Sequence, residues 1–202
     1  MATGATFQNI FFPFNNPSVI SGCQLWLDGA DPAGTGILPA NGATVSTWAD
    51  KSGNGFNATA APSRTAGTYS TSFRAVNFPT STTGYITNYS AAPTNETMFV
   101  VGNNPSPSSA NNIIIGGVQG ARSLGLGNSA GGGVGSIGNL NTQVAWLAST
   151  GGGSYSGGTT VLTTSQFTTS TNTISVNGGT VFTGGAPGFT GGRVTYLGGG
   201  CY

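Results

Sequence analysis

Short apolar runs separated by glycine dominate this chain of 202 residues, which holds 36 glycines. Within the runs, apolar residues recur at every second position and β-branched residues are frequent, as in strands buried on one face. The glycines lie mainly in pairs and triplets between the runs, where they mark turns. Glycine and β-branched residues interrupt every window of about twelve residues, which disfavours helices. The sequence therefore predicts an all-β fold.

The predicted strands follow one another at short, regular intervals. They are residues 23–28, 44–48, 74–78, 85–89, 97–102, 112–118, 122–126, 143–148, 160–167, 173–176, 180–182 and 193–197. Between two alternating stretches lies Asn177-Gly178, the strongest short-range signal for a hairpin. About a dozen short strands in one domain length indicate a β-sandwich or jelly roll of two antiparallel sheets.

Charged side chains are sparse. The chain has five Lys and Arg residues, four Asp and Glu residues and no histidine, with a net charge of +1. Five scattered cations cannot neutralise a row of phosphates, so nucleic acid is not expected as a partner. No apolar run approaches the ~20 residues needed to span a bilayer, so no membrane span is expected. A surface with so little repulsion favours association with other subunits.

The residue types needed for catalysis are largely missing. Without histidine there is no Ser-His-Asp triad, Cys-His dyad or His-ligated metal. Most glycosidases need two carboxylates flanking the scissile bond. Here Glu96 is the single glutamate, and the aspartates all lie between positions 28 and 50. We therefore expect a protein that is not an enzyme.

Two segments near the N-terminus carry a recognisable motif, QLWLDGAD at 24–31 and VSTWADKSGNGFNAT at 45–59. They resemble the opening block of concanavalin A-like (laminin-G-like) lectin and glucanase domains. Their sequence is most similar to that block in giant DNA virus and phage virion proteins. The resemblance implies a concanavalin A-like jelly roll and a virion structural protein: a minor capsid, vertex or surface-decorating component. Its partners would be other capsid subunits, and it would assemble in the host cytoplasm. A lectin-like module that binds glycans on the host surface is the alternative.

The predicted organisation is an N-terminal arm or edge segment, residues 1–20, followed by one sandwich domain, residues 21–202. In the first segment Phe11, Phe12 and Phe14 are candidate contacts with a neighbouring subunit; an edge strand on the chain's own core is the alternative. Compared with the resembled domains, the chain lacks a closing strand after residues 193–198. Either it is a fragment, or a neighbour supplies that strand.

Asp28, Asp31 and Asp50 are candidate calcium ligands, because hard cations take clustered carboxylate oxygens. The resemblance points the same way, since many laminin-G-like domains bind calcium at one rim. In the alternative interpretation, these aspartates cap backbone amides in turns. No other cofactor is expected. The motif also places Trp26 and Trp48 on neighbouring strands, where we expect both rings in the core.

Tyr85, Asn88 and Tyr89 are the candidate carbohydrate-binding residues, with half-buried packing as the alternative for the tyrosines. The two cysteines, Cys23 and Cys201, lie near opposite ends of the chain. Adjacent terminal strands, as the resemblance implies, would allow them to form a disulfide. Two unrelated thiols are the alternative, because no secretory segment is recognisable.

Overall fold

The structure is a computed structural model that describes residues 17–79, 82–89, 95–103, 113–117, 123–125, 140–142, 145–147, 159–168, 171–179, 182–185 and 195–198. Within these ranges the one helical element is a short 3-10 helix, η1 (Pro17–Val19), and all other regular elements are strands. The all-β prediction is confirmed. In the same ranges no helix has the length and apolar character needed to cross a membrane.

Fourteen strands are described, and most of them are short. They are β1 (Thr47–Trp48), β2 (Ala58–Ala60), β3 (Thr68–Ser70), β4 (Ala75–Asn77), β5 (Gly84–Thr87), β6 (Glu96–Asn103), β7 (Ile113–Gly117), β8 (Ser123–Gly125), β9 (Leu140–Thr142), β10 (Ala145–Leu147), β11 (Thr160–Phe167), β12 (Thr171–Val176), β13 (Phe182–Gly185) and β14 (Thr195–Gly198).

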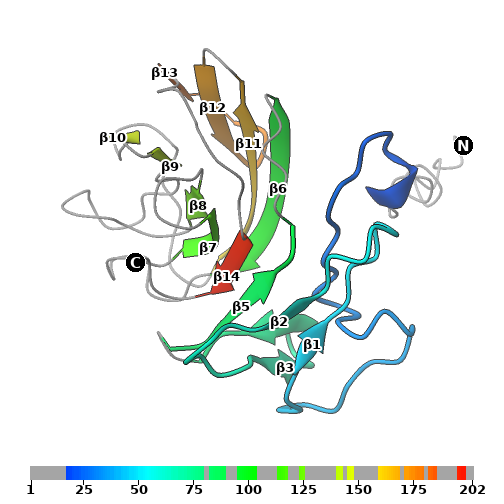
Figure 1. Cartoon of the computed structure of the whole chain (residues 1–202). Helices are drawn as coiled ribbons and strands as arrows, with labels where there is room; N and C mark the ends of the chain where they lie inside the picture. Colours follow the sequence, from blue (N-terminus) through cyan, green and yellow to red (C-terminus); the bar gives the residue numbers. More distant parts are fainter. Residues whose placement is uncertain are drawn as a thin grey trace, which may run out of the picture.

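These strands form three antiparallel sheets within the described residues (Figure 1). The largest has eight strands in the order β1-β2-β5-β14-β7-β8-β9-β10, the second has four in the order β13-β12-β11-β6, and the third is the β3–β4 pair. The small third sheet differs from the predicted two. β14 lies between β5 and β7, so both of its edges are paired. The jelly-roll arrangement and the missing closing strand stay predictions.

One hydrophobic cluster joins the N-terminal strands to β14. Its buried members are Val45, Ala58, Tyr69, Val76, Tyr85 and Leu197, and the partly buried Leu27, Trp48, Ala66 and Phe78 pack against it. The ring of Tyr85 meets Trp48 and Phe78 edge to face, with centroids 6.0 Å and 5.9 Å away. Its hydroxyl donates to the Val45 carbonyl (2.6 Å) and accepts from the Gly67 N–H (2.8 Å). Tyr85 therefore connects three segments of the chain.

The Asn177-Gly178 hairpin is confirmed. Asn177 and Gly178 both have positive φ, 49° and 69°, as a type I′ turn requires. The Gly179 N–H donates to the Val176 carbonyl (2.8 Å) and closes the turn. The strands before and after this turn, β12 and β13, pair in an antiparallel ladder.

The predicted strand at residues 23–28 is wrong. This segment forms a single bridge, Leu27 to Asp50, and is otherwise held by contacts with the loop at 50–56. Here a side chain replaces a backbone partner, because the N–H of Trp26 donates to the carboxylate of Asp50. An apolar alternating run can therefore stay irregular when a neighbouring polar loop satisfies its backbone.

The inner face of the β6–β11 pair is partly polar. Val100 and Val161 are buried there, together with Thr163 and Ser165. The hydroxyls of Thr163 and Ser165 have no hydrogen-bond partner in the described part of the structure. A buried hydroxyl without a partner lowers stability, since it has lost its hydration.

Replacing Thr163 by valine should therefore raise the free energy of unfolding by about 1 kcal/mol, because the shape is nearly kept and an unpaired hydroxyl is removed. Urea unfolding followed by tryptophan fluorescence measures it. Thr87→Val is the matched control: Thr87 is equally buried, but its hydroxyl accepts from the Tyr89 N–H (3.1 Å), so this change should destabilise. A loss of stability in Thr163→Val as large as in the control would contradict the prediction.

Candidate functional site

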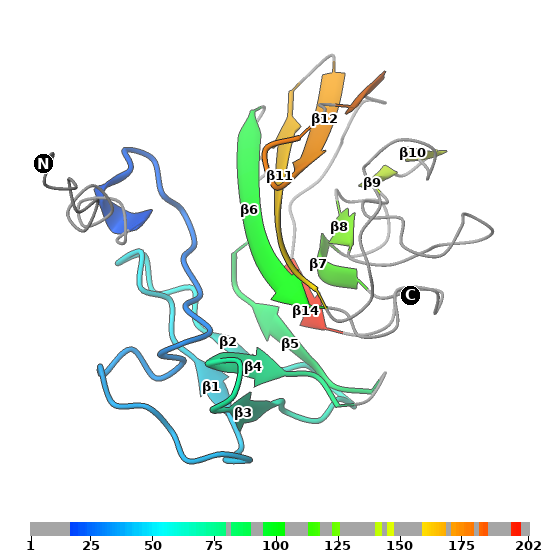
Figure 2. The same cartoon turned by 180° about the vertical axis from the view of Figure 1, so that it is seen from behind.

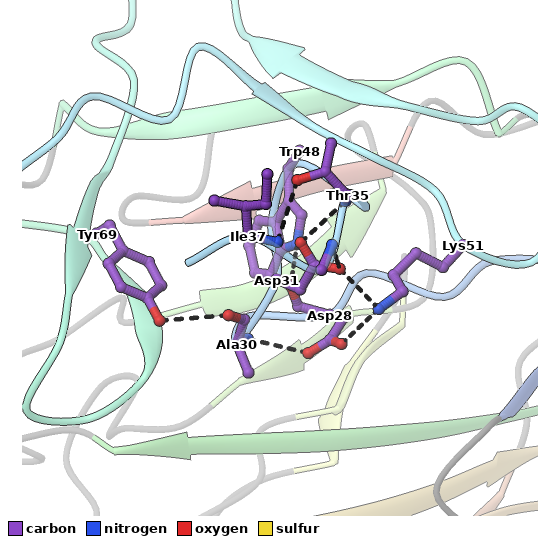
Figure 3. Close-up of polar contacts among 9 residues, drawn as sticks. Asp28, Ala30, Asp31, Thr35, Ile37, Trp48, Lys51 and Tyr69 are labelled. Atoms are coloured by element: carbon purple, nitrogen blue, oxygen red, sulfur yellow. Dashed lines mark hydrogen bonds and ion pairs between the residues drawn. The ribbon is translucent and has the colours of Figure 1, made fainter. Parts of the chain in front are cut away.

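The candidate cation site lies where the loop that starts at Asp28 meets the loop that starts at Asp50 (Figure 3). Asp28 and Asp31 stand on the first loop, which is held against the hydrophobic cluster by two hydrogen bonds, one from β1 and one from β3. Trp48 Nε1 donates to the Asp28 carbonyl (3.0 Å), and the Tyr69 hydroxyl donates to the Ala30 carbonyl (3.2 Å). The partly buried Trp48 and the buried Tyr69 thus fix the backbone that carries both carboxylates.

Lys51 lies between the two carboxylates. Its Nζ is 2.8 Å from Asp28 Oδ2 and 3.2 Å from Asp31 Oδ2. The same ammonium stands 4.7 Å from the centroid of the Trp26 ring, a cation–π contact. We call Lys51, Asp28, Asp31 and Trp26 the lysine clamp. It joins the two loops across 20 or more positions of sequence.

Backbone amides fill the remaining positions around Asp28 and Asp31. Asp28 Oδ1 accepts from the Ala30 N–H (2.9 Å). Asp31 accepts from the N–H groups of Thr35 (3.1 Å) and Gly36 (3.0 Å). These are the turn-capping bonds of the alternative interpretation.

Asp50 organises the second loop from within. Its carboxylate accepts from the N–H groups of Trp26 (3.0 Å), Ser52 (2.9 Å) and Phe56 (2.9 Å), and from the Ser52 hydroxyl (2.8 Å). Asn54 adds two bonds to the segment before the first loop, from Nδ2 to the carbonyls of Cys23 (3.1 Å) and Gln24 (3.0 Å). The SGNG part of the motif therefore serves to hold residues 23–26 in place.

The hydrogen bonds shift the pKa values of these groups. Burial raises the pKa of Asp31, but the Gly36 N–H and the Lys51 ammonium outweigh burial and hold it below its ordinary value. The pKa of Asp50 is also lowered, because the amides of Trp26, Ser52 and Phe56 outweigh burial. Hydrogen bonding to Asp28 raises the pKa of Lys51, more than burial lowers it.

The three aspartates are not arranged as a calcium site. Within the residues that the structure describes, no cluster of three His, Cys, Asp or Glu side chains is placed to hold a metal ion. Between Asp28 and Asp31 the position of a cation is taken by the Lys51 ammonium. The oxygens of Asp50 accept from backbone amides of its own loop and of Trp26. Calcium binding stays a prediction, and these contacts do not support it.

The predicted carbohydrate trio is not assembled on the surface. Tyr85 is 0% exposed and Tyr89 is 5% exposed, whereas Asn88 is exposed. The Tyr89 ring packs edge to face on Phe56, with centroids 5.3 Å apart. Burial raises the pKa of Tyr85 despite the bond from Gly67. Neither ring can stack on a sugar, so the packing alternative holds for both tyrosines, since their rings complete the interior.

The structure tests the predicted positions of the two tryptophans but not the predicted disulfide or assembly contacts. Trp48 packs against the hydrophobic cluster as expected, whereas Trp26 is half-buried beneath Lys51. Cys23 is half-buried, and burial together with the charge of Asp50 raises the pKa of its thiol. Its predicted partner, Cys201, lies outside the described residues, and so do the predicted assembly contacts. Those contacts are Phe11, Phe12 and Phe14.

Sequence reasoning missed Lys51 as the centre of this region. The signal was available, because Lys51 is the single lysine of the chain and stands directly after Asp50 in the motif. A lone ammonium in a chain this poor in charge finds the nearby carboxylates as its partners. The ammonium of Lys51, and not a bound metal ion, is therefore the positive charge between Asp28 and Asp31 in this structure.

Comparison of the sequence with known protein families gives no match, and comparison with curated proteins gives none either. Among solved structures, a variant of a GH54 α-L-arabinofuranosidase, soaked with 4-nitrophenyl α-L-arabinofuranoside, is similar to this chain. The TM-score is 0.58 with 18% sequence identity, and the alignment covers 78% of this chain and 44% of that chain. The chain thus spans less than half of that protein's length. At this identity the likeness shows a shared β-rich fold.

The lysine clamp should slow the reaction of Lys51 with amine reagents. Only the neutral amine reacts, and a raised pKa lowers the fraction of Lys51 in that form. We expect the folded protein to be acetylated at Lys51 more slowly than the urea-unfolded protein. Mass spectrometry of the Lys51 peptide measures the rate. Asp31→Asn should accelerate the folded-state reaction and Ser52→Ala should not; equal rates for folded and unfolded protein would contradict the clamp.

The clamp and the Asp50 loop also predict how stability depends on pH. Lowered pKa values of Asp31 and Asp50 contribute stability that is present above the unfolded value, about 3.9, and is lost as the pH falls through the folded values. The raised pKa of Lys51 contributes stability below about pH 10 that is lost as the pH rises further. Urea unfolding at a series of pH values should show a free energy of unfolding that is highest between these two limits and falls on either side. Asp31→Asn should make the fall at low pH smaller. A free energy of unfolding that stays constant down to about pH 2 would exclude this account.

Proposed function

We propose that this protein is a non-enzymatic structural component of a virion, a minor capsid, vertex or surface-decorating subunit that acts by packing against other subunits. The observation that carries the proposal is the outer face of β6 and β11. Phe99, Val101 and Leu162 are 62%, 70% and 39% exposed there. Val101 lies directly opposite Leu162 in the ladder. We call these three residues the outer patch; an exposed apolar patch of this kind is typical of a protein contact.

The charge distribution supports the same proposal. A net charge of +1 gives little repulsion between copies or neighbouring subunits. Three of the four carboxylates are engaged within the chain, since Asp28 and Asp31 bind Lys51 and Asp50 binds the amides of Trp26, Ser52 and Phe56. Packing, and not chemistry, is the role that these side chains favour.

A mass-spectrometric inventory of purified virus particles tests the proposal. The protein is expected among the particle proteins after treatments that remove loosely bound material. A tagged Val101→Lys copy, supplied beside a tagged wild-type copy, should enter particles less often, because an ammonium replaces the centre of the outer patch. Ile37→Lys is the matched control, since Ile37 is exposed to a similar extent, 74%, outside this patch. Absence of the wild-type protein from purified particles would refute the proposal.

A carbohydrate-binding module is the second candidate. The observation that favours it is the likeness in fold to an arabinofuranosidase soaked with an arabinofuranoside. A glycan array that includes arabinofuranosides tests it, and binding should then depend on exposed residues such as Asn88. The same chromogenic arabinoside tests the non-enzymatic part of our proposal: release of 4-nitrophenol by the purified protein would contradict it.

A further inference from the structure

β6 is the longest strand that ends a sheet in the described structure. It has eight residues and pairs on one side with β11 (Figure 2). The other strands that end the two large sheets, β1, β10 and β13, have two, three and four residues. On the side of β6 away from β11, alternate backbone N–H and C=O groups therefore point out of the sheet. Among the described strands, none pairs with that side.

Within its own described residues, the β6 edge lacks the sequence features that usually prevent edge-to-edge association. Such edges normally carry lysine, proline, a bulge or a charge that points inward. Between Thr97 and Asn103 there is no charged residue and no proline, and β6 pairs with β11 without a register shift. Glu96 stands at the first position of the strand.

We propose that the β6 edge binds a second copy of this chain, by antiparallel pairing of β6 with β6 around a two-fold axis perpendicular to the sheet. The two four-stranded sheets then form one continuous sheet, with β6 and its copy at the centre. This inference rests on the proposed function as a packing subunit and names its first partner. The geometry is isologous, because the same surface serves both copies.

The sequence of β6 selects one register. With Val100 on the axis, Phe99 of each copy lies opposite Val101 of the other. Both are exposed outer-patch residues, and an aromatic residue opposite a β-branched one is a stabilising cross-strand pair. Each Val101 is already flanked by Leu162 across the ladder with β11. The two outer patches then merge into one apolar strip.

The remaining pairs of this register are also compatible. Met98 lies opposite Gly102, a large side chain beside a small one, and Thr97 lies opposite Asn103. No pair joins like charges, because Glu96 falls outside the paired region. Moving the axis to Phe99 keeps the two faces aligned but places Val101 opposite Thr97, which removes both aromatic–valine pairs. The hydrophobic pattern therefore favours Val100 on the axis.

Sedimentation of the purified full chain tests the dimer. The wild-type protein is expected to be dimeric, and Val101→Lys should raise the dimer dissociation constant at least about tenfold. Ile37→Lys, at an equally exposed apolar residue away from β6, should leave it unchanged. Circular dichroism shows whether each variant keeps its β spectrum. A wild-type chain that stays monomeric up to about 1 mM, or a Val101→Lys variant that dimerises as well as wild type, overturns the proposal.

Disulfide trapping tests the register itself. In a Cys23→Ser, Cys201→Ser background, Phe99→Cys protein is mixed with Val101→Cys protein and oxidised. Opposed residues in antiparallel strands have Cα atoms about 4.5–5.5 Å apart, within the range of a disulfide. The mixture should give a covalent dimer that contains one of each chain, and neither variant alone should react as fast. Cross-linking of either variant with itself at the same rate overturns this register.

The failures of the two proposals are distinguishable. A protein found in particles but monomeric in solution keeps the proposed function and overturns the β6 dimer. A protein that dimerises with the predicted cross-link but is absent from particles keeps the dimer and refutes the virion role.

Discussion

Replacing Tyr85 by alanine should lower the free energy of unfolding by about 4 kcal/mol, the usual range for emptying a large aromatic site. The ring is 0% exposed and packs on Trp48 and Phe78. Its loss leaves a cavity, and it also removes the hydrogen-bond partner of the Gly67 N–H and of the Val45 carbonyl. Urea unfolding followed by circular dichroism measures the change.

Tyr85→Phe separates the two contributions. It keeps the ring and removes only the hydroxyl, so the cost should be about 1–3 kcal/mol, as expected for buried groups left without a partner. Tyr69→Phe is a matched control, because its hydroxyl makes a single, longer bond of 3.2 Å to the Ala30 carbonyl. A cost below about 1 kcal/mol for Tyr85→Ala would place the ring at the surface and revive its predicted role in sugar binding.

The second large effect is expected at Gly198, the last residue of β14. Its φ is +125°, and a Cβ there would lie 2.5 Å from the Thr83 carbonyl oxygen and 2.8 Å from the Gly84 Cα. Both contacts are with backbone at the beginning of β5, the strand that pairs with β14, so the neighbours cannot turn away. Gly198→Ala should cost about 3–5 kcal/mol, from overpacking and backbone strain together.

Gly178→Ala is the control for Gly198→Ala. Gly178 also has positive φ, +69°, but a Cβ there meets nothing within 4 Å. Gly178→Ala should lower the free energy of unfolding by only about 1 kcal/mol, the strain of a left-handed residue alone. Thermal unfolding of both variants gives the comparison. Equal losses at the two positions would show that the close approach of β14 to β5 is not what Gly198 provides.

The sequence predicted most of the longer strands, because local patterns determine them. Residues 160–167 form β11 with the predicted bounds, and residues 97–102 lie within β6. Alternation of apolar and polar residues over such lengths indicates a strand without reference to the rest of the chain. The hairpin turn at Asn177-Gly178 was predicted correctly for the same reason: its signal is local, since both residues tolerate positive φ.

The short strands could not be predicted in this way. β2 and β3 have three residues each and no alternation long enough to detect. Both are defined by their pairing and not by a local pattern: β2 pairs with the distant β5, and β3 pairs with β4, the next strand along the chain. For residues 23–28 the error was the reverse: a strand was predicted where none forms. The pattern was that of a strand, but the polar loop at 50–56 provides the contacts of this segment.

In the candidate site too, the sequence predicted which residues belong together but not what they contact. That Asp28, Asp31 and Asp50 belong to one region followed from the motif. Their partners did not, since only the folded chain shows that Lys51 lies between two of them. For Tyr85 and Tyr89 a polar ring at a strand end looks the same in sequence whether it is exposed or buried. Packing decided that both are interior.

The bond from the Gly67 amide to the Tyr85 hydroxyl has a consequence for hydrogen exchange. This N–H is protected by a buried side chain and not by a neighbouring strand, so fraying of a sheet edge does not expose it. Its proton can exchange with solvent only when the Tyr85 ring leaves the interior, which requires the segments at Val45, Gly67 and β5 to separate together. The exchange rate of this single amide therefore reports the cooperative opening of the N-terminal part of the molecule.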